Sequence, residues 1–466
     1  MTPVPLPGLA ESARGIAEGS LTPTGLVEAA LARIAALEPS LHAFIELTAD
    51  RARRAAAEAE REIRAGRMRG PLHGIPYGLK DLYDVAGLRT TAHSRVLLDN
   101  VAQSDADATA RLEAAGMVLL GKLSTHEFAT GGPNPEVPFP CAVSPWHAGH
   151  FAGGSSSGSG VAVSAGMLPL AMGSDTGGSI RLPAAYCGIV GLKPTYGRLS
   201  RHGVVPLSFS MDHAGPLTRT VEDCAMAMQV LAGYDPRDPG SADVAVPDYL
   251  ASLRAGVSGL RVGYARAFNA EAGVDAEEAA AMDGAARVLG ELGAEVTDVV
   301  LPSWDHMAAA SWGIIHAEWF AVHQETLRTR PLDYARITRE RLMLGAFVTG
   351  AQYVQAQRLR LLLSRELDAL LARCDVLLVA PIAGAAPPLD ALEEVPLRSA
   401  QPLTAPFNLT GHPAMCLPCG LSAAGLPLSL QVVGRQFDEA MVLRVGHAYE
   451  QAAGWFRHRP LELTAA

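Results

Sequence analysis

The sequence predicts an α/β protein in which a large mixed sheet is covered by helices on both faces. The chain has 466 residues, of which 49% are hydrophobic and 18% charged, so it can bury a large apolar core. From about residue 70 onward, short apolar runs alternate with segments of helical periodicity, a pattern typical of a sheet packed between helices. The sequence shows neither an internal repeat nor a low-complexity linker.

Two helices are predicted before the first of these runs. Thr22 is suited to cap a helix, Pro23 suits the first helical position, and apolar residues follow at helical spacing as far as Pro39, where we expect this helix to end. Residues 49–67 carry both signs of charge on an alanine-rich scaffold. Because the acids largely balance the bases, we expect a solvated helix there and not a nucleic-acid-binding patch.

The strands are predicted from eight apolar runs: "GIPYGLK", "GMVLLGK", "LPLAMGS", "LRVGYA", "AEVTDVVLP", "CDVLLVAP", "PAMCLP" and "LSLQVVG". The segment "GYDPRDPGSADVAVPDY" is the most loop-like connection between them. We expect one domain, 1–466, made of an N-terminal helical segment, 1–69, a catalytic core, 70–235, and a second half, 236–466. That second half is expected to complete the sheet and the substrate pocket.

Charge and composition exclude several classes of protein. The net charge of −10 repels phosphate backbones and disfavours non-specific nucleic-acid binding. The chain starts without a secretory signal pattern and contains no run of about 18 apolar residues, so we expect a cytoplasmic protein with no membrane partner. Six cysteines in so long a chain do not form a disulfide framework. Cys416 and Cys419 form C-x-x-C, for which we favour a buried strand over a redox or zinc site.

The stretch "AGGSSSGSG" contains G-x-S-x-G centred on Ser156, the pattern of a nucleophile elbow. An elbow needs a buried strand directly before it, but "SPWHAGHFAGG" does not have the pattern of a strand. A phosphate-binding loop is also excluded, since no Gly-Lys-Ser/Thr follows the glycines of this stretch. His147 and His150 form H-x-x-H without further clustered ligands, so we expect no metal there.

The residues after this stretch predict a second serine position. "LPLAMG" has the pattern of a short buried strand, and "SDTGGSIRLPAAY" that of a turn leading into a helix. Ser179 therefore lies near a predicted helix N-terminus, where unpaired backbone N–H groups converge and would stabilise an oxyanion.

The whole segment "GGSSSGSGVAVSAGMLPLAMGSDTGGSIRLPAAYCGIVGLKPT" resembles the signature region of the amidase signature family, hydrolases with a Ser-cisSer-Lys triad. The resemblance continues in "PLHGIPYGLKD", "GPLTRTVEDCA" and "TAPFNLTGHPA", and so covers most of the chain from about residue 70. It implies Ser179 as the nucleophile, Ser155 as the bridging serine in a cis peptide and Lys80 as the base. No cofactor and no metal are implied.

The resemblance also implies an oxyanion hole made of the backbone N–H groups of Thr176, Gly177, Gly178 and Ser179. Asp175 and Arg181 flank this turn, and we expect them to pair and brace it. Lys80 must be neutral to act as a base, so it has to be buried in apolar surroundings. Asp81 would oppose that effect, but strand alternation is expected to turn its side chain away.

Substrate-binding residues are expected in the variable segments around the signature, at Glu127, Thr130, Gly131, Trp312 and Tyr353. Aromatic side chains at these positions suggest an apolar or arylated substrate, although spacing alone fits a core position for Trp312 equally well.

Three functions remain open from the sequence. The first is a stand-alone amidohydrolase for a small amide, including aryl amides and carbamates (a urethanase). Its only partners would be that substrate and, in a homodimer, a second copy. The alternative is the glutamine-hydrolysing amidase subunit of a tRNA-dependent amidotransferase. In those subunits an acidic residue that holds the glutamine amine stands about where this chain has Gln401. The third is a catalytically silent binding protein, against which the intact Lys80, Ser155 and Ser179 argue.

Overall fold

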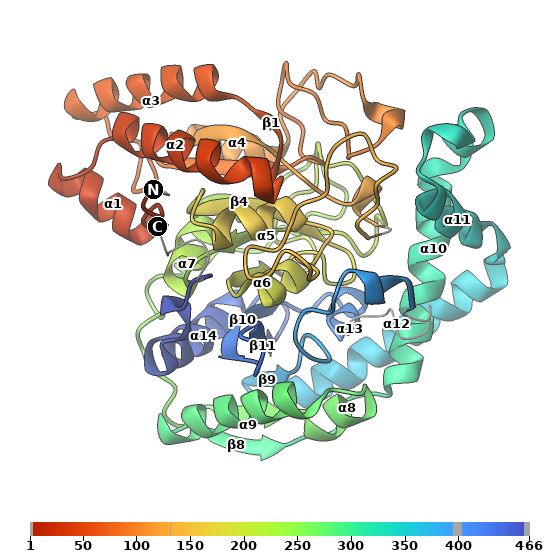
Figure 1. Ribbon diagram of the computed structural model, residues 1–466. Coiled ribbons are helices and arrows are strands. Elements are labelled where there is room, and N and C mark those ends of the chain that lie inside the picture. Colours follow the sequence, from red (N-terminus) through yellow and green to blue (C-terminus); the bar gives the residue numbers. More distant parts are fainter. Residues whose placement is uncertain (1–2, 131, 395–402, 461–466) are drawn as a thin grey trace.

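A single mixed sheet of eleven strands runs through the molecule in the computed structural model, which describes residues 3–130, 132–394 and 403–460 (Figure 1). Its strand order is β1-β3-β2-β4-β6-β5-β10-β11-β9-β7-β8. The strands are β1 (Phe44–Leu47), β2 (Pro76–Lys80), β3 (Val118–Leu123), β4 (Leu170–Asp175), β5 (Val190–Lys193), β6 (His213–Thr218), β7 (Arg261–Tyr264), β8 (Glu295–Asp298), β9 (Val376–Val379), β10 (Ala414–Leu421) and β11 (Pro427–Gly434). The predicted α/β class with a mixed sheet is confirmed, since β2, β3 and β4 pair in parallel while β10 and β11 pair antiparallel.

Fourteen α-helices in the described residues surround the sheet on both faces (Figure 1). Helices α2, α3 and α4 lie at the end of the sheet formed by β1 to β3, α5 and α6 pack over its middle, and α8 and α9 lie at the β8 end. A long pair, α10 and α12, projects to one side and carries α11 (Figure 1). The helices are α1 (Leu9–Glu18), α2 (Pro23–Leu41), α3 (Ala49–Arg64), α4 (Asp107–Ala114), α5 (Ser157–Ser164), α6 (Arg181–Cys187), α7 (Val221–Leu231), α8 (Arg266–Glu271), α9 (Ala276–Glu291), α10 (Trp304–Thr329), α11 (Arg336–Leu344), α12 (Gly350–Leu371), α13 (Ala405–Leu409) and α14 (Glu439–Ala453).

The predicted elements are largely found, but two helix ends differ: the helix expected over residues 49–67 ends at Arg64, and the one expected to end at Pro39 runs on. Each of the eight apolar runs contains a strand, and Cys416 and Cys419 are buried in β10. Thr22 caps α2 by accepting a hydrogen bond from the Gly25 N–H, as predicted. Helix α2 does not end at Pro39, however, but continues to Leu41. Pro39 lies in the last turn, so its ring costs one hydrogen bond, to the Ala35 carbonyl, and only two helical residues follow it.

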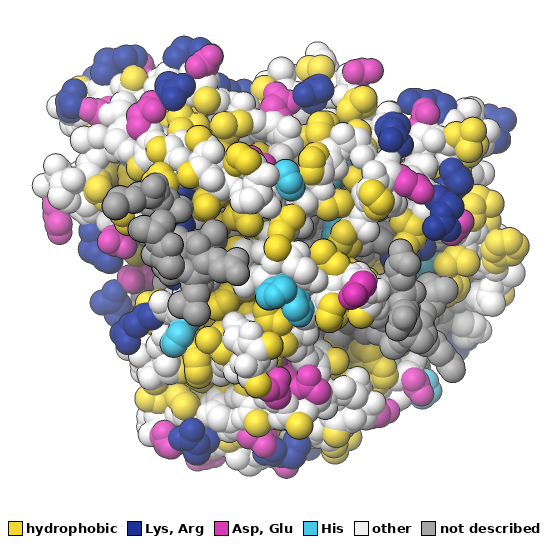
Figure 2. Space-filling model, viewed as in Figure 1, with side chains coloured by type: hydrophobic (Ala, Val, Ile, Leu, Met, Phe, Trp, Pro, Cys, Tyr) yellow, Lys and Arg dark blue, Asp and Glu magenta, His cyan; other side chains and the backbone are white. Residues whose placement is uncertain are grey.

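The N-terminal helices have the charge distribution expected of solvated surfaces. On α3, Arg64 pairs with Glu60, and Arg53 pairs with Glu28 of α2. Figure 2 shows basic and acidic side chains intermixed over α3 and again over α10 and α11. None of the helices in the described ranges combines the length and the apolar character needed to cross a membrane.

The middle of the sheet positions the residues of the candidate site. Strands β2 and β4 are parallel neighbours, with Gly78 opposite Ala171 and Leu79 opposite Met172. Lys80 is the last residue of β2, and β4 ends at Asp175. Because the carboxyl ends of parallel neighbours meet at the same edge of a sheet, Lys80 lies beside the turn that follows β4.

Candidate active site

Lys80 is completely buried and contacts two serine hydroxyls. Its Nζ donates to Ser155 Oγ at 2.7 Å and to Ser174 Oγ at 2.9 Å. The Gly154–Ser155 peptide bond is cis, as the family resemblance implies. Burial lowers the pKa of Lys80 to about 7, although the charges of Asp175 and Asp212 oppose this shift. A neutral amine in contact with a hydroxyl can accept a proton from it.

The neighbouring Asp81 does not face this amine. Its carboxylate lies 2.9 Å from Lys122 Nζ and accepts hydrogen bonds from the backbone and side chain of Thr91. Alternation along the chain therefore turns the Asp81 charge to the opposite side of the sheet, as expected. Among the residues that the structure describes, Lys80 is thus left without a carboxylate in direct contact.

Ser179 lies on the turn between β4 and α6, and its side chain is partly exposed. The Ser156 N–H donates to the Ser179 carbonyl at 3.1 Å, which holds the two serine segments together. The Ser156 hydroxyl itself is engaged with the backbone of Ser174, at 3.2 Å from both its N and its O. The Ser156 hydroxyl is therefore already engaged by backbone groups, whereas Ser179 is partly exposed on the turn.

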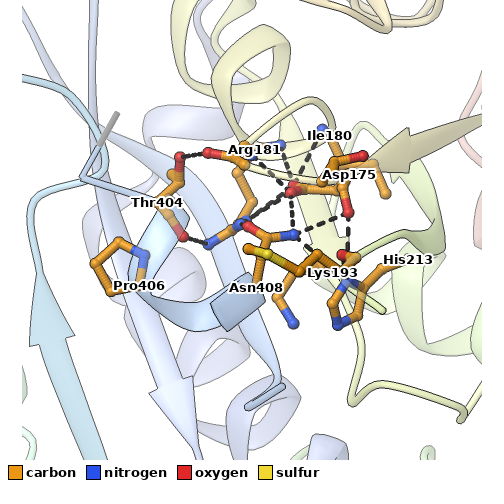
Figure 3. Close-up of polar contacts among 12 residues, drawn as sticks. Asp175, Ile180, Arg181, Lys193, His213, Thr404, Pro406 and Asn408 are labelled. Carbon is orange, nitrogen blue, oxygen red and sulfur yellow. Dashed lines mark hydrogen bonds and ion pairs between the residues drawn. The ribbon is translucent and has the colours of Figure 1, made fainter. Parts of the chain in front are cut away.

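A buried ion pair braces the same turn (Figure 3). The Asp175 carboxylate lies 2.9 Å from Arg181 Nη2 and also accepts hydrogen bonds from the Asn408 side chain and the Ile180 N–H. Both charged side chains are fully buried. Burial alone would raise the pKa of Asp175, but the adjacent Arg181 charge and the hydrogen bonds hold it well below its ordinary value.

Arg181 extends this brace to the second half of the chain. Its Nη1 donates to the Thr404 carbonyl at 2.8 Å and to Gln431 Oε1 at 2.7 Å, and its Nη2 donates to Asn408 Oδ1 at 2.5 Å. The Thr404 hydroxyl donates in turn to the Gly177 carbonyl at 2.7 Å. Residues more than 200 positions away in the sequence therefore fix the turn that carries Ser179.

The four amides proposed for an oxyanion hole differ in their availability. The Gly178 N–H donates to Asp175 Oδ1 at 2.7 Å, so it is already occupied and is not a free oxyanion donor in this structure. The N–H groups of Thr176, Gly177 and Ser179 have no acceptor among the described parts of the chain. Gly178 has φ +141°, and a Cβ there would overlap the Thr404 hydroxyl, so only glycine fits.

The residues expected to bind substrate are dispersed, and some have other partners. Glu127 is buried and accepts hydrogen bonds from Ser94 Oγ at 2.6 Å and from the Ala335 N–H at 3.0 Å. Trp312 stacks on His316, and the Tyr353 hydroxyl donates to Glu318 at 2.8 Å. Thr130 is partly exposed beyond the turn formed by residues 127–129. Gly131 and Gln401 lie outside the described residues.

Several residues of the site were missed from the sequence. Ser174, which touches Lys80, and Asn408, which touches Asp175, lie inside motifs that carry the family resemblance, "GSDTGGS" and "TAPFNLTG". Asp212 carries no sequence signal, but its carboxylate accepts from the Thr176 hydroxyl at 2.5 Å. Ser174, Thr176 and Asp212 line one end of a cavity of about 530 Å³ that reaches Tyr196 and Arg201.

The H-x-x-H pair does not extend into a metal site within the part of the chain that the structure describes. His147 Nδ1 and His150 Nδ1 lie 2.8 Å apart, but no group of three or more His, Cys, Asp or Glu side chains surrounds them or any other point there.

Comparison with known proteins gives matches that cover almost the whole chain. The amidase family model matches residues 25–443. The A subunit of the glutamyl-tRNA(Gln) amidotransferase from Chloroflexus aggregans is 41% identical over 96% of this chain and 96% of its own. A solved chain from an inhibitor-bound protein complex, described as revealing the evolutionary origins of an s-triazine catabolic enzyme, superposes with a TM-score of 0.90 at 35% identity, covering 96% of this chain and 99% of that one. A bacterial aryl acylamidase of the amidase signature family gives 0.88 at 28%, covering 97% and 98%.

These relatives contradict the prediction about partners. From the sequence we expected a small-molecule amide or carbamate as substrate, no nucleic acid and at most a second copy of the chain. A relative matched from end to end is instead one subunit of an enzyme named for glutamyl-tRNA(Gln). Net charge was a poor guide because it bears only on direct contacts between this chain and a phosphate backbone and says nothing about partner subunits.

Proposed function

The chain belongs to the amidase signature family, and we propose that it hydrolyses an amide through a covalent ester on Ser179. One observation carries this proposal: the fully buried amine of Lys80 lies 2.7 Å from the Ser155 hydroxyl. With a pKa of about 7, a large fraction of this amine is neutral near pH 7 and able to act as a base.

The proposed reaction moves one proton along these three side chains. As Ser179 Oγ attacks the amide carbonyl, its proton passes to Ser155, whose own proton passes to the Lys80 amine. Free N–H groups of the turn stabilise the oxyanion that forms. The Lys80 ammonium then returns a proton through Ser155 to the leaving nitrogen, which departs as ammonia or an amine. Water, deprotonated by the same route, hydrolyses the ester and regenerates Ser179.

We further propose that this chain works as the amide-hydrolysing subunit of an amidotransferase assembly, with glutamine as the amide donor. The support is the 41% identity to the amidotransferase A subunit, which extends over 96% of both proteins. In such an assembly the ammonia released from glutamine would be used by another subunit, so the free chain need not show its full activity.

A second candidate is hydrolysis of a small amide, including an aryl amide or a carbamate, as an enzyme in its own right. The observation that favours it is the high structural similarity to an aryl acylamidase and to a chain from the complex linked to an s-triazine catabolic enzyme. A carbamate carbonyl would meet the same nucleophile and the same oxyanion donors as an amide carbonyl.

Two assays on the purified chain and on Ser179→Ala separate these candidates. The first measures ammonia or amine release from glutamine, an aryl anilide and an aryl carbamate by the chain alone. The second repeats the glutamine assay with the remaining subunits of the Chloroflexus aggregans amidotransferase and glutamyl-tRNA(Gln). Ser179-dependent glutamine hydrolysis that rises in the second assay supports the amidotransferase role. Turnover of the anilide or carbamate by the chain alone supports the second candidate, and absence of Ser179-dependent turnover in both assays contradicts amide hydrolysis.

A further inference from the structure

Helix α10 carries a carboxylate that is buried without a cation in direct contact. Glu318 is 2% exposed, and the structure gives it no ion pair within its described ranges. Its four hydrogen bonds come from neutral donors: Ser208 Oγ and Ser210 Oγ at 2.6 Å each, the Ser210 N–H at 3.0 Å and the Tyr353 hydroxyl at 2.8 Å. Arg360, from α12, donates to Ser210 and not to Glu318 itself. A carboxylate kept from water in this way costs free energy unless its partners are held in place, so these contacts strongly constrain the groups that make them.

Three of these four donors belong to one loop, residues 207–212, which a second carboxylate holds from its other side. Asp212 accepts hydrogen bonds from the Leu207 N–H at 2.8 Å and from the Ser208 N–H at 3.0 Å. The loop is therefore folded between Glu318 on α10 and its own Asp212. A change at Glu318 must shift the loop that positions the Asp212 carboxylate.

Asp212 connects this loop to the nucleophile turn. Its Oδ1 accepts a hydrogen bond from the Thr176 hydroxyl at 2.5 Å. Thr176 stands three positions before Ser179, and its own N–H is among the amides left free for an oxyanion in the described part of the chain. A continuous chain of contacts thus runs from Tyr353 on α12, through Glu318 and the loop, to Thr176.

We propose that Glu318 is a positioning residue for the turn that carries Ser179, acting through Asp212 and Thr176. This inference rests on the proposed amide hydrolysis and adds to it a part of the site that no sequence motif marks. It also gives Tyr353 a different role from the substrate contact predicted from the sequence, since its hydroxyl orients Glu318.

The Glu318→Gln variant tests this inference. An amide has the size of the carboxylate but only one acceptor oxygen. In this variant the amide NH2 group would therefore face some of the loop's donors in place of a carboxylate oxygen. We expect kcat for the amide substrate to fall roughly tenfold or more while KM changes less than about twofold, because the turn matters mainly in the transition state. The rate at which a fluorophosphonate labels Ser179 should fall in the same proportion. Glu325→Gln, an exposed position on the same helix, is the matched control and should leave both rates unchanged.

Two further variants show whether the effect passes through Thr176. Thr176→Val removes the hydroxyl that Asp212 accepts from, and Thr176→Ser restores it. We expect the valine variant to lose activity, the serine variant to recover it, and Glu318→Gln to cost much less in the valine background than alone. Tyr353→Phe, which removes one donor only, should give a smaller loss of kcat in the same direction and serves if Glu318→Gln fails to fold.

The outcomes separate this inference from the function on which it rests. A folded Glu318→Gln protein with the kcat and the labelling rate of the unaltered chain overturns the inference, and so does strict additivity with Thr176→Val. If Glu318→Gln does not fold, unchanged kcat in Tyr353→Phe overturns it. An unaltered chain that neither turns over amides nor is labelled at Ser179 contradicts the proposed function itself.

Discussion

Activity should fall steeply below pH 7, because the proposed base must be neutral and its pKa is about 7. The variable is pH, and the pH at which activity falls is set by the burial of Lys80, which lowers the pKa of this amine from 10.5 to about 7. Below the pKa, the neutral fraction drops about tenfold for each pH unit, so kcat/KM at pH 5 should be roughly one hundredth of its plateau value. The assay is kcat/KM for an amide substrate from pH 5 to pH 9.

Two results would refute this reasoning. One is a flat profile across that range, and the other is a kcat/KM that still rises about tenfold per pH unit up to pH 9, as expected for an exposed lysine that titrates near pH 10. Lys80→Arg is the matched control. A guanidinium keeps its proton at all these pH values and cannot act as a base, so this variant should show no turnover at any pH in the range. Circular dichroism at each pH separates titration of the base from unfolding.

Three other perturbations give distinct signatures. Arg181→Met strands a buried carboxylate and should lower the free energy of unfolding in urea by about 3–5 kcal/mol; a loss below about 1 kcal/mol would contradict the bracing role. Asp212→Asn removes a negative charge that raises the pKa of Lys80, so this pKa should fall and the acidic limb of kcat/KM should move to lower pH. A move to higher pH would contradict Lys80 as the group that titrates. Gly154→Ala adds a methyl that overlaps the His126 ring and should reduce kcat, whereas Gly284→Ala, which has open space, should not; equal kcat in the two variants would contradict this.

The elements that the sequence predicted best are those whose pattern is local. Runs such as "CDVLLVAP" are buried on both sides and are continuously apolar, so each was recognisable by itself. β1, which has only four residues, was not predicted, and neither were β5 and β6, because Gly191 lies in the first of these two and Gly215 and Pro216 in the second. Their place in the sheet comes from pairing with β4 and β10, which a local pattern does not contain.

The residues of the candidate site also differ in whether a local sequence motif marks them. The predicted triad residues lie in segments that resemble a known family, so they could be proposed from the sequence alone. Glu318 and Asp212 stand outside those segments, and what brings them together is the folding of a loop between two helices and the sheet. The hydrogen bond from the Gly178 N–H to Asp175 could not be predicted either, because a sequence gives the number of N–H donors but not which side chain accepts from them.

The two parts into which the sequence was predicted to divide, residues 70–235 and 236–466, are joined at the turn that carries Ser179. The loop at residues 233–249 is a boundary in composition, yet β5 of the first half pairs with β10 of the second. Arg181, two positions after Ser179, donates to Thr404 and to Gln431 on β11. Without those acceptors the guanidinium would be buried with unmade hydrogen bonds, which is costly. The second half therefore completes the Ser179 turn as well as the sheet, and we expect neither half to hold Ser179 in place alone.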